Sequence, residues 1–174
     1  RTQRRGGRGV QGAMSKEEDF VEHLFIANTH NYMLFFTDQG KCYWLKVYDI
    51  PQGGRAARGR AIVNLIGCDP GEKIEAFVSV KEFDDNHYIA MATRNGIVKK
   101  TVLSAYGKPR KGGIYAIEIR DGDKLIEARV TNGEHDILLG TSEGKSIRFS
   151  ESDIRASGRK TMGVKGITLG SKED

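Results

Sequence analysis

The sequence has few of the residues that build disulfide-linked or metal-linked folds. It contains two cysteines, Cys42 and Cys68, and neither has C-x-x-C or Cys/His ligand spacing around it. A disulfide framework or a zinc site therefore has little support, and we expect two buried free thiols. No apolar run approaches the roughly 20 residues that a membrane-spanning helix needs, so no membrane partner is expected. The chain also begins at Arg1 without an initiator Met or an apolar leader, which suggests a piece of a longer protein.

Sequence patterns of catalytic sites are missing as well. The phosphate-binding pattern G-x-x-x-x-G-K-[ST] does not occur, and the four histidines have no metal-ligand spacing. The carboxylates around Glu17 and Asp84 are typical of solvated turns. The tyrosines lie in or next to strand patterns, where packing accounts for them; they are Tyr32, Tyr43, Tyr48, Tyr88, Tyr106 and Tyr115. We therefore expect no catalytic residue, no cofactor and no metal in this chain.

The sequence does contain a repeat of about fifty residues. A Thr-x-x-Gly pattern, typical of a hairpin turn, begins at Thr37, Thr93 and Thr141. Ten residues after each turn glycine stands an apolar or aromatic residue; these are Ile50, Tyr106 and Ile154. A second mark is a glycine before a β-like apolar stretch, found at Gly9, Gly59, Gly113 and Gly163. A third mark places Gly71 and Gly122 at the same period, so three landmarks agree.

The segments between these marks predict β-strands. They are short, apolar or β-branched, and bounded by Gly, Asn and Asp. Such segments begin at Leu24, Tyr32, Cys42, Tyr88, Ile97, Asp136 and Lys145. A helical turn is indicated from Glu17, and no continuous helix is expected elsewhere.

About four strands in about fifty residues are typical of a propeller blade, which buries its faces only when neighbouring blades stack against it. We predict an all-β chain of three four-stranded blades, roughly residues 10–66, 67–119 and 120–174. A β-sandwich is the alternative, but it does not explain the repeating marks. Three blades are fewer than the roughly four to eight of a closed ring, so we expect the remaining blades outside this chain. Strands left open in this way could also be covered by self-association of two chains.

The net charge of +5 is unevenly distributed over the repeat. Four basic windows, residues 1–9, 55–60, 108–111 and 155–165, hold 14 of the 28 basic residues and none of the 23 acidic ones. The basic residues are Arg1, Arg4, Arg5, Arg8, Arg55, Arg58, Arg60, Lys108, Arg110, Lys111, Arg155, Arg159, Lys160 and Lys165. Because the windows fall at one phase of the repeat, a propeller places them along one rim as a curved positive track.

A curved positive track suits double-stranded DNA. Lys and Arg that neutralise phosphates release condensed counterions without reading the base sequence. Glycine beside arginine lets the backbone approach the DNA and offers N–H groups to phosphate oxygens. Bending 20 to 30 bp by 40 to 90° costs roughly 1 to 6 kcal/mol, so several contacts along the arc are needed. RNA is less well supported, because the aromatic residues lie in strand patterns and not beside the arginines.

Other functions fit parts of this pattern. A propeller can be a protein-interaction platform, but such a platform needs no acid-free basic loop in each repeat. A hydrolase on a propeller scaffold needs clustered acid and base groups at strand ends, and none is recognisable. The stretch R-R-G-G-R-G is similar to an RNA-binding RGG tract, although a single copy that leads into strands is weak support.

The first basic window carries a specific motif. Its residues Gln3, Arg4, Arg5, Gly6, Gly7, Arg8 and Gly9 resemble the gyrase A box, Q-[RK]-R-G-G-[RK]-G, at all seven positions. Three further stretches resemble the first blade of the C-terminal DNA-wrapping domain of the bacterial gyrase A family. They are E-E-D-F-V-E-H-L-F-I-A-N-T-H, Y-W-L-K-V-Y-D-I-P and R-G-R-A-I-V-N-L. The later stretches G-I-Y-A-I-E-I-R-D-G-D-K-L and G-V-K-G-I are similar to its general blade pattern. The resemblance covers essentially the whole chain and is strongest over residues 2–66.

The resemblance implies a β-pinwheel, a propeller variant in which blades exchange strands, usually of six blades. It implies that duplex DNA binds around the perimeter while the whole enzyme introduces negative supercoils. It also implies the partners, namely the rest of the gyrase A protein and the gyrase B protein in a heterotetramer of the bacterial cytoplasm, at the nucleoid. ATP, Mg²⁺ and the cleaving tyrosine are implied for other parts of the holoenzyme. The related topoisomerase IV C-terminal domain, in which the box is degraded or absent, is the alternative.

Overall fold

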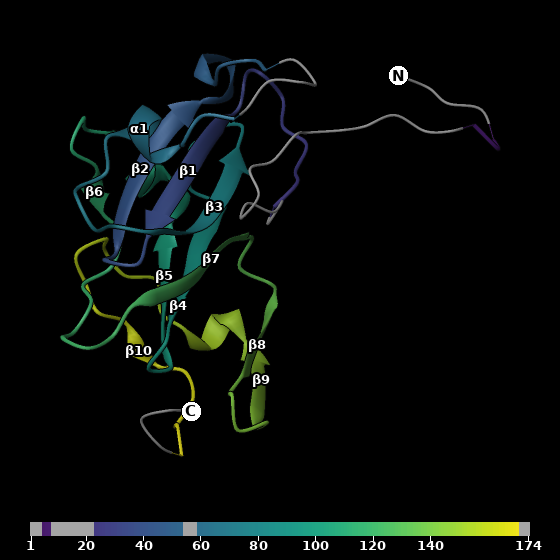
Figure 1. Ribbon diagram of the computed structural model, residues 1–174. Helices are drawn as coiled ribbons and strands as arrows, with labels where there is room; N and C mark the ends of the chain where they lie inside the picture. The colour runs from purple at the N-terminus through teal and green to yellow at the C-terminus, as the bar shows by residue number, and fades with distance from the viewer. Residues whose placement is uncertain (1–4, 8–22, 54–58, 171–174) are drawn as a thin grey trace.

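The computed structural model describes residues 5–7, 23–53 and 59–170, and strands dominate them (Figure 1). The strands are β1 (Tyr32–Thr37), β2 (Lys41–Lys46), β3 (Ile74–Val80), β4 (Tyr88–Thr93), β5 (Ile97–Val102), β6 (Ile114–Tyr115), β7 (Leu125–Thr131), β8 (Asp136–Gly140), β9 (Ser146–Ser150) and β10 (Val164–Lys165). The helical elements are α1 (Val63–Ile66) and the 3-10 turns η1 (Val47–Asp49), η2 (Leu103–Tyr106) and η3 (Glu151–Asp153). The predicted all-β fold class is confirmed.

Each Thr-x-x-Gly pattern forms the hairpin turn that the sequence predicts. The turns join β1 to β2, β4 to β5 and β8 to β9 in antiparallel pairs. The turn glycines, Gly40, Gly96 and Gly144, have φ angles of 80°, 79° and 82°. These angles lie in the left-handed region that glycine enters at little steric cost, so the repeated spacing has a backbone reason. A 3-10 turn follows each hairpin, and the apolar residue ten positions after the glycine either ends that turn or directly follows it.

The sheets are completed by strands that cross from one repeat to the previous one. The first sheet has the order β3-β1-β2-β6, and the second has the equivalent order β7-β4-β5-β10. β6 follows the second hairpin in the chain, yet it pairs with β2 of the first hairpin. β10 pairs with β5 in the same way. Figure 1 shows β6 beside β2 and β10 beside β5, which is the strand exchange expected of a β-pinwheel.

The turn glycines also receive the exchanged chain. The carbonyl oxygen of Gly40 accepts hydrogen bonds from the N–H groups of Ala116 (2.8 Å) and Ile117 (3.2 Å), directly after β6. Gly96 accepts the equivalent pair of hydrogen bonds directly after β10. A Cβ atom on Gly40 would lie 2.5 Å from the carbonyl oxygen of Ile117. The exchanged segment therefore packs against the turn with no room for a side chain between them.

The larger hydrophobic cluster lies between the first and second sheets. It joins side chains of β1, β2, β3 and β6 with side chains of β4, β7 and η2. Leu34, Phe36, Ile89, Tyr106 and Leu125 are among its fully buried members. Burial of each large apolar side chain contributes roughly 1.5 to 3 kcal/mol, so stacking of successive sheets is a main source of stability.

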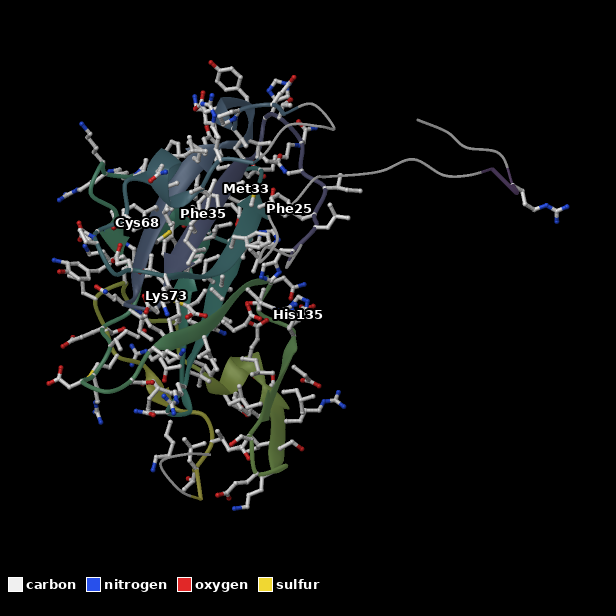
Figure 2. The ribbon with its side chains drawn as sticks, in the orientation of Figure 1. Phe25, Met33, Phe35, Cys68, Lys73 and His135 are labelled. Carbon is white, nitrogen blue, oxygen red and sulfur yellow. The ribbon has the colours of Figure 1, made fainter. Side chains whose placement is uncertain are left out.

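A smaller cluster covers the other face of the first sheet. Met33 and Phe35 alternate along β1 with the residues that face the larger cluster, so this strand is buried on both faces. Ile66 of α1 packs on them, with Cys68 at the edge of the cluster. Figure 2 shows Met33 and Phe35 on β1, with the sulfur of Cys68 to their left.

The prediction of a strand from Leu24 is wrong. Residues 23–28 pair with no strand among the described residues, and Leu24 and Ile26 are 93% and 100% exposed. By its place before a hairpin, this segment corresponds to β3 and β7, which each pair with the first strand of the preceding hairpin. The described part of the chain has no hairpin before β1, so the segment lacks a sheet edge to join.

The β-like stretch expected after Gly59 is also wrong. Val63–Ile66 forms α1, and the helix ends at Gly67, which has a φ of 65°. Because Ile62 and Ile66 are four residues apart, the helical turn places both against the smaller cluster. The equivalent stretches after Gly113 and Gly163 do form strands, β6 and β10. The helical turn expected from Glu17 lies outside the described residues.

The third hairpin forms a two-stranded sheet of its own, to the lower right of β4 and β5 in Figure 1. No described strand joins β8 or β9 in the way that β3 and β6 join the first hairpin. Leu138 on β8 is consequently 71% exposed. The blade boundaries and the self-association of two chains stay predictions.

Candidate nucleic-acid interface

The first two basic windows are described only in part. In the first window Arg5, Gly6 and Gly7 are exposed, and in the second Arg60 is exposed. The remaining candidate residues of these windows lie outside the described residues: Arg1, Gln3, Arg4, Arg8, Gly9, Arg55 and Arg58. Their assignment to DNA binding stays a prediction.

The third basic window forms a loop between η2 and β6. Its cations, Lys108, Arg110 and Lys111, are all exposed. The N–H of Gly113 donates to the carbonyl oxygen of Arg110 at 2.9 Å and closes the loop. A Cβ atom on Gly113 would lie 2.8 Å from the ring of Tyr43, so this glycine lets the loop lie directly on β2.

The fourth basic window runs from η3 to β10. Arg155, Lys160 and Lys165 are exposed, and Arg159 is partly buried. Arg159 Nη1 donates to the carbonyl oxygen of Tyr115 on β6 at 2.9 Å, and Lys160 Nζ lies 5.9 Å from the centre of the Tyr115 ring. The structure therefore brings this window next to the strand that follows the third window.

Both loops lie at the same edge of successive sheets. They lead into β6 and β10, the last strands of their sheets, while β3 and β7 at the opposite edges contact each other. Figure 1 shows β6 and β10 on the left of the view, with β3 and β7 nearer its centre. The shared phase of these two windows in the sequence thus corresponds to a shared outer rim.

The cations of the described windows have no carboxylate partner within ion-pair distance among residues 5–7, 23–53 and 59–170. The ion pairs of that part of the chain use other basic side chains, such as Lys41, Lys124, Arg129 and Arg148. Because exposed, uncompensated cations attract phosphate groups, the rim has the electrostatic character of a polyanion-binding surface.

Two adjacent lysines of β5 hold the fourth window from inside. Lys99 is 1% exposed, and its Nζ donates to the carbonyl oxygens of Ala116 (2.6 Å) and Arg159 (2.7 Å). Lys100 is 6% exposed, and its Nζ donates to the carbonyl oxygen of Glu151 at 2.8 Å. Neither lysine is among the residues predicted from the sequence. Their signal is a pair of consecutive lysines inside an apolar strand, where alternation turns one toward each face.

The side chain of Glu151 anchors η3, which directly precedes the fourth window. Its fully buried carboxylate accepts hydrogen bonds from Thr131 Oγ1 (2.6 Å) and the His135 N–H (2.8 Å), and Lys100 Nζ lies 3.7 Å away. Burial acts to raise the pKa of this carboxyl, but the hydrogen bonds and the ammonium outweigh it and hold the pKa below its ordinary value. The negative charge is compensated inside the protein and does not face the rim.

Lys99→Met is expected to destabilise the chain by about 2 kcal/mol at pH 7, because the carbonyl oxygens of Ala116 and Arg159 lose their donor. Burial also lowers the pKa of Lys99 from 10.5 to about 8. Between these pH values the folded chain releases a proton that the unfolded chain keeps, so the contribution of Lys99 to stability rises with pH. Urea unfolding at pH 7 and pH 9.5 should therefore show a larger difference between wild type and variant at the higher pH.

Lys108→Met is the control for this experiment, because Lys108 is exposed and its replacement should change stability by about 0.5 kcal/mol or less. Burial raises the pKa of Cys42, Tyr43 and Tyr106, so the chain loses stability at high pH. Wild type and variants share this loss, and it therefore cancels when their free energies of unfolding are subtracted. A difference between wild type and Lys99→Met that shrinks as the pH rises would contradict the buried-lysine interpretation.

The aromatic and thiol residues differ in part from expectation. Tyr43 and Tyr106 are buried, in agreement with the packing role expected of the tyrosines. Tyr115 is 53% exposed and lies beside Lys160, so the aromatic residues are not all separate from the basic ones. Cys42 is a buried free thiol as predicted, whereas Cys68 is only partly buried.

Across the described ranges no cluster of His, Cys, Asp and Glu could hold a metal ion, and no helix is long and apolar enough to cross a membrane.

Comparison with known proteins identifies a family. A family model for the DNA gyrase C-terminal domain, a β-propeller, matches residues 1–28, 31–81, 87–132 and 135–174. The DNA gyrase A protein of Clostridium acetobutylicum is 52% identical over 165 residues, and that of Escherichia coli K12 is 48% identical over 168 residues. These alignments cover 95% and 97% of this chain but 20% and 19% of the relatives, so the chain spans about a fifth of their length.

Solved structures share the fold. The C-terminal domain of DNA topoisomerase IV superposes with a TM-score of 0.81 at 30% identity, over 92% of this chain and 50% of that one. A DNA gyrase A C-terminal domain superposes with a TM-score of 0.68 at 24% identity, over 83% of this chain and 46% of that one, which shows the fold alone. Since the family model matches nearly every residue, the chain belongs to the DNA gyrase C-terminal domain family, whose fold is a β-propeller.

Proposed function

We propose that the chain binds and bends duplex DNA around its basic rim, as the wrapping module of a DNA gyrase. The observation that carries this proposal is the position of the third and fourth basic windows. Both present exposed cations at the outer edges of successive sheets, and neither window contains an acidic residue. Membership of the gyrase family supports duplex DNA as the polyanion.

The geometry suits DNA bending because the cationic loops lie on successive sheets and not at one point. A smooth bend of 20 to 30 bp costs roughly 1 to 6 kcal/mol, so several contacts along the arc are needed to offset it. Loops on successive sheets contact the DNA at successive points of an arc, and each neutralised phosphate adds a sequence-independent gain. β6 pairs with β2 and β10 pairs with β5, and this pairing ties each loop to the edge of the sheet that its strand joins.

In the whole enzyme, this chain supplies a curved DNA segment and no chemistry. The proposed partners are the rest of the gyrase A protein and the gyrase B protein, in a heterotetramer of the bacterial cytoplasm. ATP hydrolysis, Mg²⁺ binding and DNA cleavage belong to those other parts. Wrapping by this module then biases strand passage toward negative supercoils.

A second candidate is the corresponding module of topoisomerase IV, which the TM-score of 0.81 favours as a structural match. The complete box sequence from Gln3 to Gly9 favours gyrase. A topology assay tests wrapping directly: nicked plasmid ligated in the presence of the full-length enzyme without ATP should acquire a changed linking number if the module wraps DNA. An unchanged linking number would exclude wrapping.

DNA affinity should fall steeply with salt. If about six phosphates are neutralised, a plot of log K against log salt concentration should have a slope near −5. Fluorescence anisotropy with a labelled 40-bp duplex between 50 and 200 mM salt measures it, and duplexes of unrelated sequence should give the same slope within error. An affinity that stays flat over this range would contradict the basic-rim proposal.

A further inference from the structure

Tyr115 is an exposed aromatic residue on the rim. It lies on β6, the outermost strand of the first sheet, and its side chain is 53% exposed. The position equivalent to it on β10 is occupied by Lys165. The fourth window, with Arg159 and Lys160, lies directly beside it. An aromatic side chain in this position is not part of the larger hydrophobic cluster, so core packing does not account for it.

The backbone that carries this ring is held from three directions. Tyr115 pairs with Lys41 of β2, and its carbonyl oxygen accepts the hydrogen bond from Arg159. The next carbonyl oxygen, that of Ala116, accepts a hydrogen bond from the buried ammonium of Lys99. The ring is therefore presented from a fixed base, and little conformational entropy is lost when a ligand covers it.

The surroundings of the ring combine apolar surface with positive charge. Lys160 Nζ lies 5.9 Å from the ring centre, within the range of a cation–π contact. The ammonium of Lys41, by contrast, is neutralised by Asp69 and Glu72. Duplex DNA offers the complementary pair of surfaces, because apolar deoxyribose and base edges lie next to charged phosphates in its grooves.

We propose that Tyr115 is a non-ionic DNA contact on this rim: its ring packs against deoxyribose and base edges of duplex DNA while Lys160 binds an adjacent phosphate. The proposal rests on the proposed function of the chain and adds a second kind of contact to it. Cations alone let DNA slide along the rim, since every phosphate is equivalent. A ring that enters a groove has a preferred rotational setting of the helix, so it fixes the register of the wrapped DNA.

The test separates ionic from non-ionic binding in the full-length protein. Plots of log K against log salt concentration for a labelled 40-bp duplex give a slope and an affinity extrapolated to 1 M salt. Tyr115→Ala should lower the extrapolated affinity about five- to tenfold and leave the slope unchanged. Lys160→Ala should make the slope shallower by about 0.9, the loss of one phosphate contact. Tyr115→Phe keeps the ring and should behave as the wild type.

Leu138→Ala is the matched control, because Leu138 is also exposed and apolar but lies on β8, outside the basic windows. It should bind DNA as the wild type does, and thermal unfolding checks that all variants remain folded. Wild-type affinity of Tyr115→Ala at every salt concentration would overturn the contact, and so would a loss in Tyr115→Phe as large as in Tyr115→Ala. If the wild type itself fails to bind duplex DNA, the proposed function fails instead.

Discussion

Gly40→Ala is expected to destabilise the chain by about 3 kcal/mol. The φ of 80° at Gly40 costs a residue with a Cβ atom roughly 1 to 2 kcal/mol. The new Cβ would also lie 2.5 Å from the carbonyl oxygen of Ile117, a backbone atom of the exchanged segment. Relief of this overlap has to stretch the hydrogen bonds from Ala116 and Ile117 to Gly40, and overpacking of this kind costs roughly 1 to 3 kcal/mol. Urea unfolding measures the total.

The chain contains its own control for this prediction. Gly144 occupies the same place in the third Thr-x-x-Gly turn and has a φ of 82°, but a Cβ there would meet no atom within 4 Å. Gly144→Ala should therefore cost only the roughly 1 to 2 kcal/mol of the left-handed backbone. The difference between the two variants measures how tightly the exchanged segment packs on the turn. Equal losses would show that strand exchange places no demand on Gly40.

The hairpins were predictable because their signals are local. A Thr-x-x-Gly pattern between two apolar runs is sufficient to predict a hairpin turn, because glycine readily takes the positive φ that the turn requires. The apolar residues ten positions further, including Tyr106, mark the 3-10 turns that follow each hairpin. These features depend on residues within about a dozen positions of each other, so a single sequence contains them.

β3 and β7 were not predicted as strands, although their preceding glycines were recognised as marks of the repeat. Both strands keep an apolar residue at every second position, as at Ala76 and Val78 on β3 and at Ala128 and Val130 on β7, so their local strand pattern was present but was not used. Their strand structure depends on pairing with β1 and β4, some forty residues earlier in the chain. The glycine marks at Gly113 and Gly163 predict the two-residue strands β6 and β10, but the local pattern does not say that they pair with the preceding hairpin.

The candidate site was likewise predictable only in part. Windows without acidic residues could be found from the sequence, because charge composition does not depend on the fold. For Lys99 and Lys100 the sequence offers only a pair of lysines inside an apolar strand, and their carbonyl partners are brought to β5 by the fold. The exposed position of Tyr115 depends on the exchange of β6. Two of the lysines in the chain therefore support the rim from inside and are not available to DNA.

The second large effect is expected at the gyrase A box. Alanine in place of Arg4, Arg5 and Arg8, in the intact enzyme, should reduce the rate of supercoiling about tenfold or more, because up to three phosphate contacts are lost from the arc. Relaxation and DNA cleavage should remain largely intact, since neither needs a wrapped segment. Plasmid supercoiling, relaxation and cleavage assays on the same preparation measure the three activities.

A variant of equal charge loss distinguishes the box from positive charge in general. It replaces Lys108, Arg110 and Lys111 of the third window with alanine, and it lies on the exposed rim beside β6. Each triple variant should make the salt slope of DNA binding shallower, from about −5 to about −3, because both remove three cations. If the rim acts only through its charge, the two variants will lose supercoiling equally. A larger loss for the box variant at the same salt slope would assign the box a role in the path of the wrap. Undiminished supercoiling in the box variant would remove it from the mechanism and leave the rim loops as the elements that bend DNA.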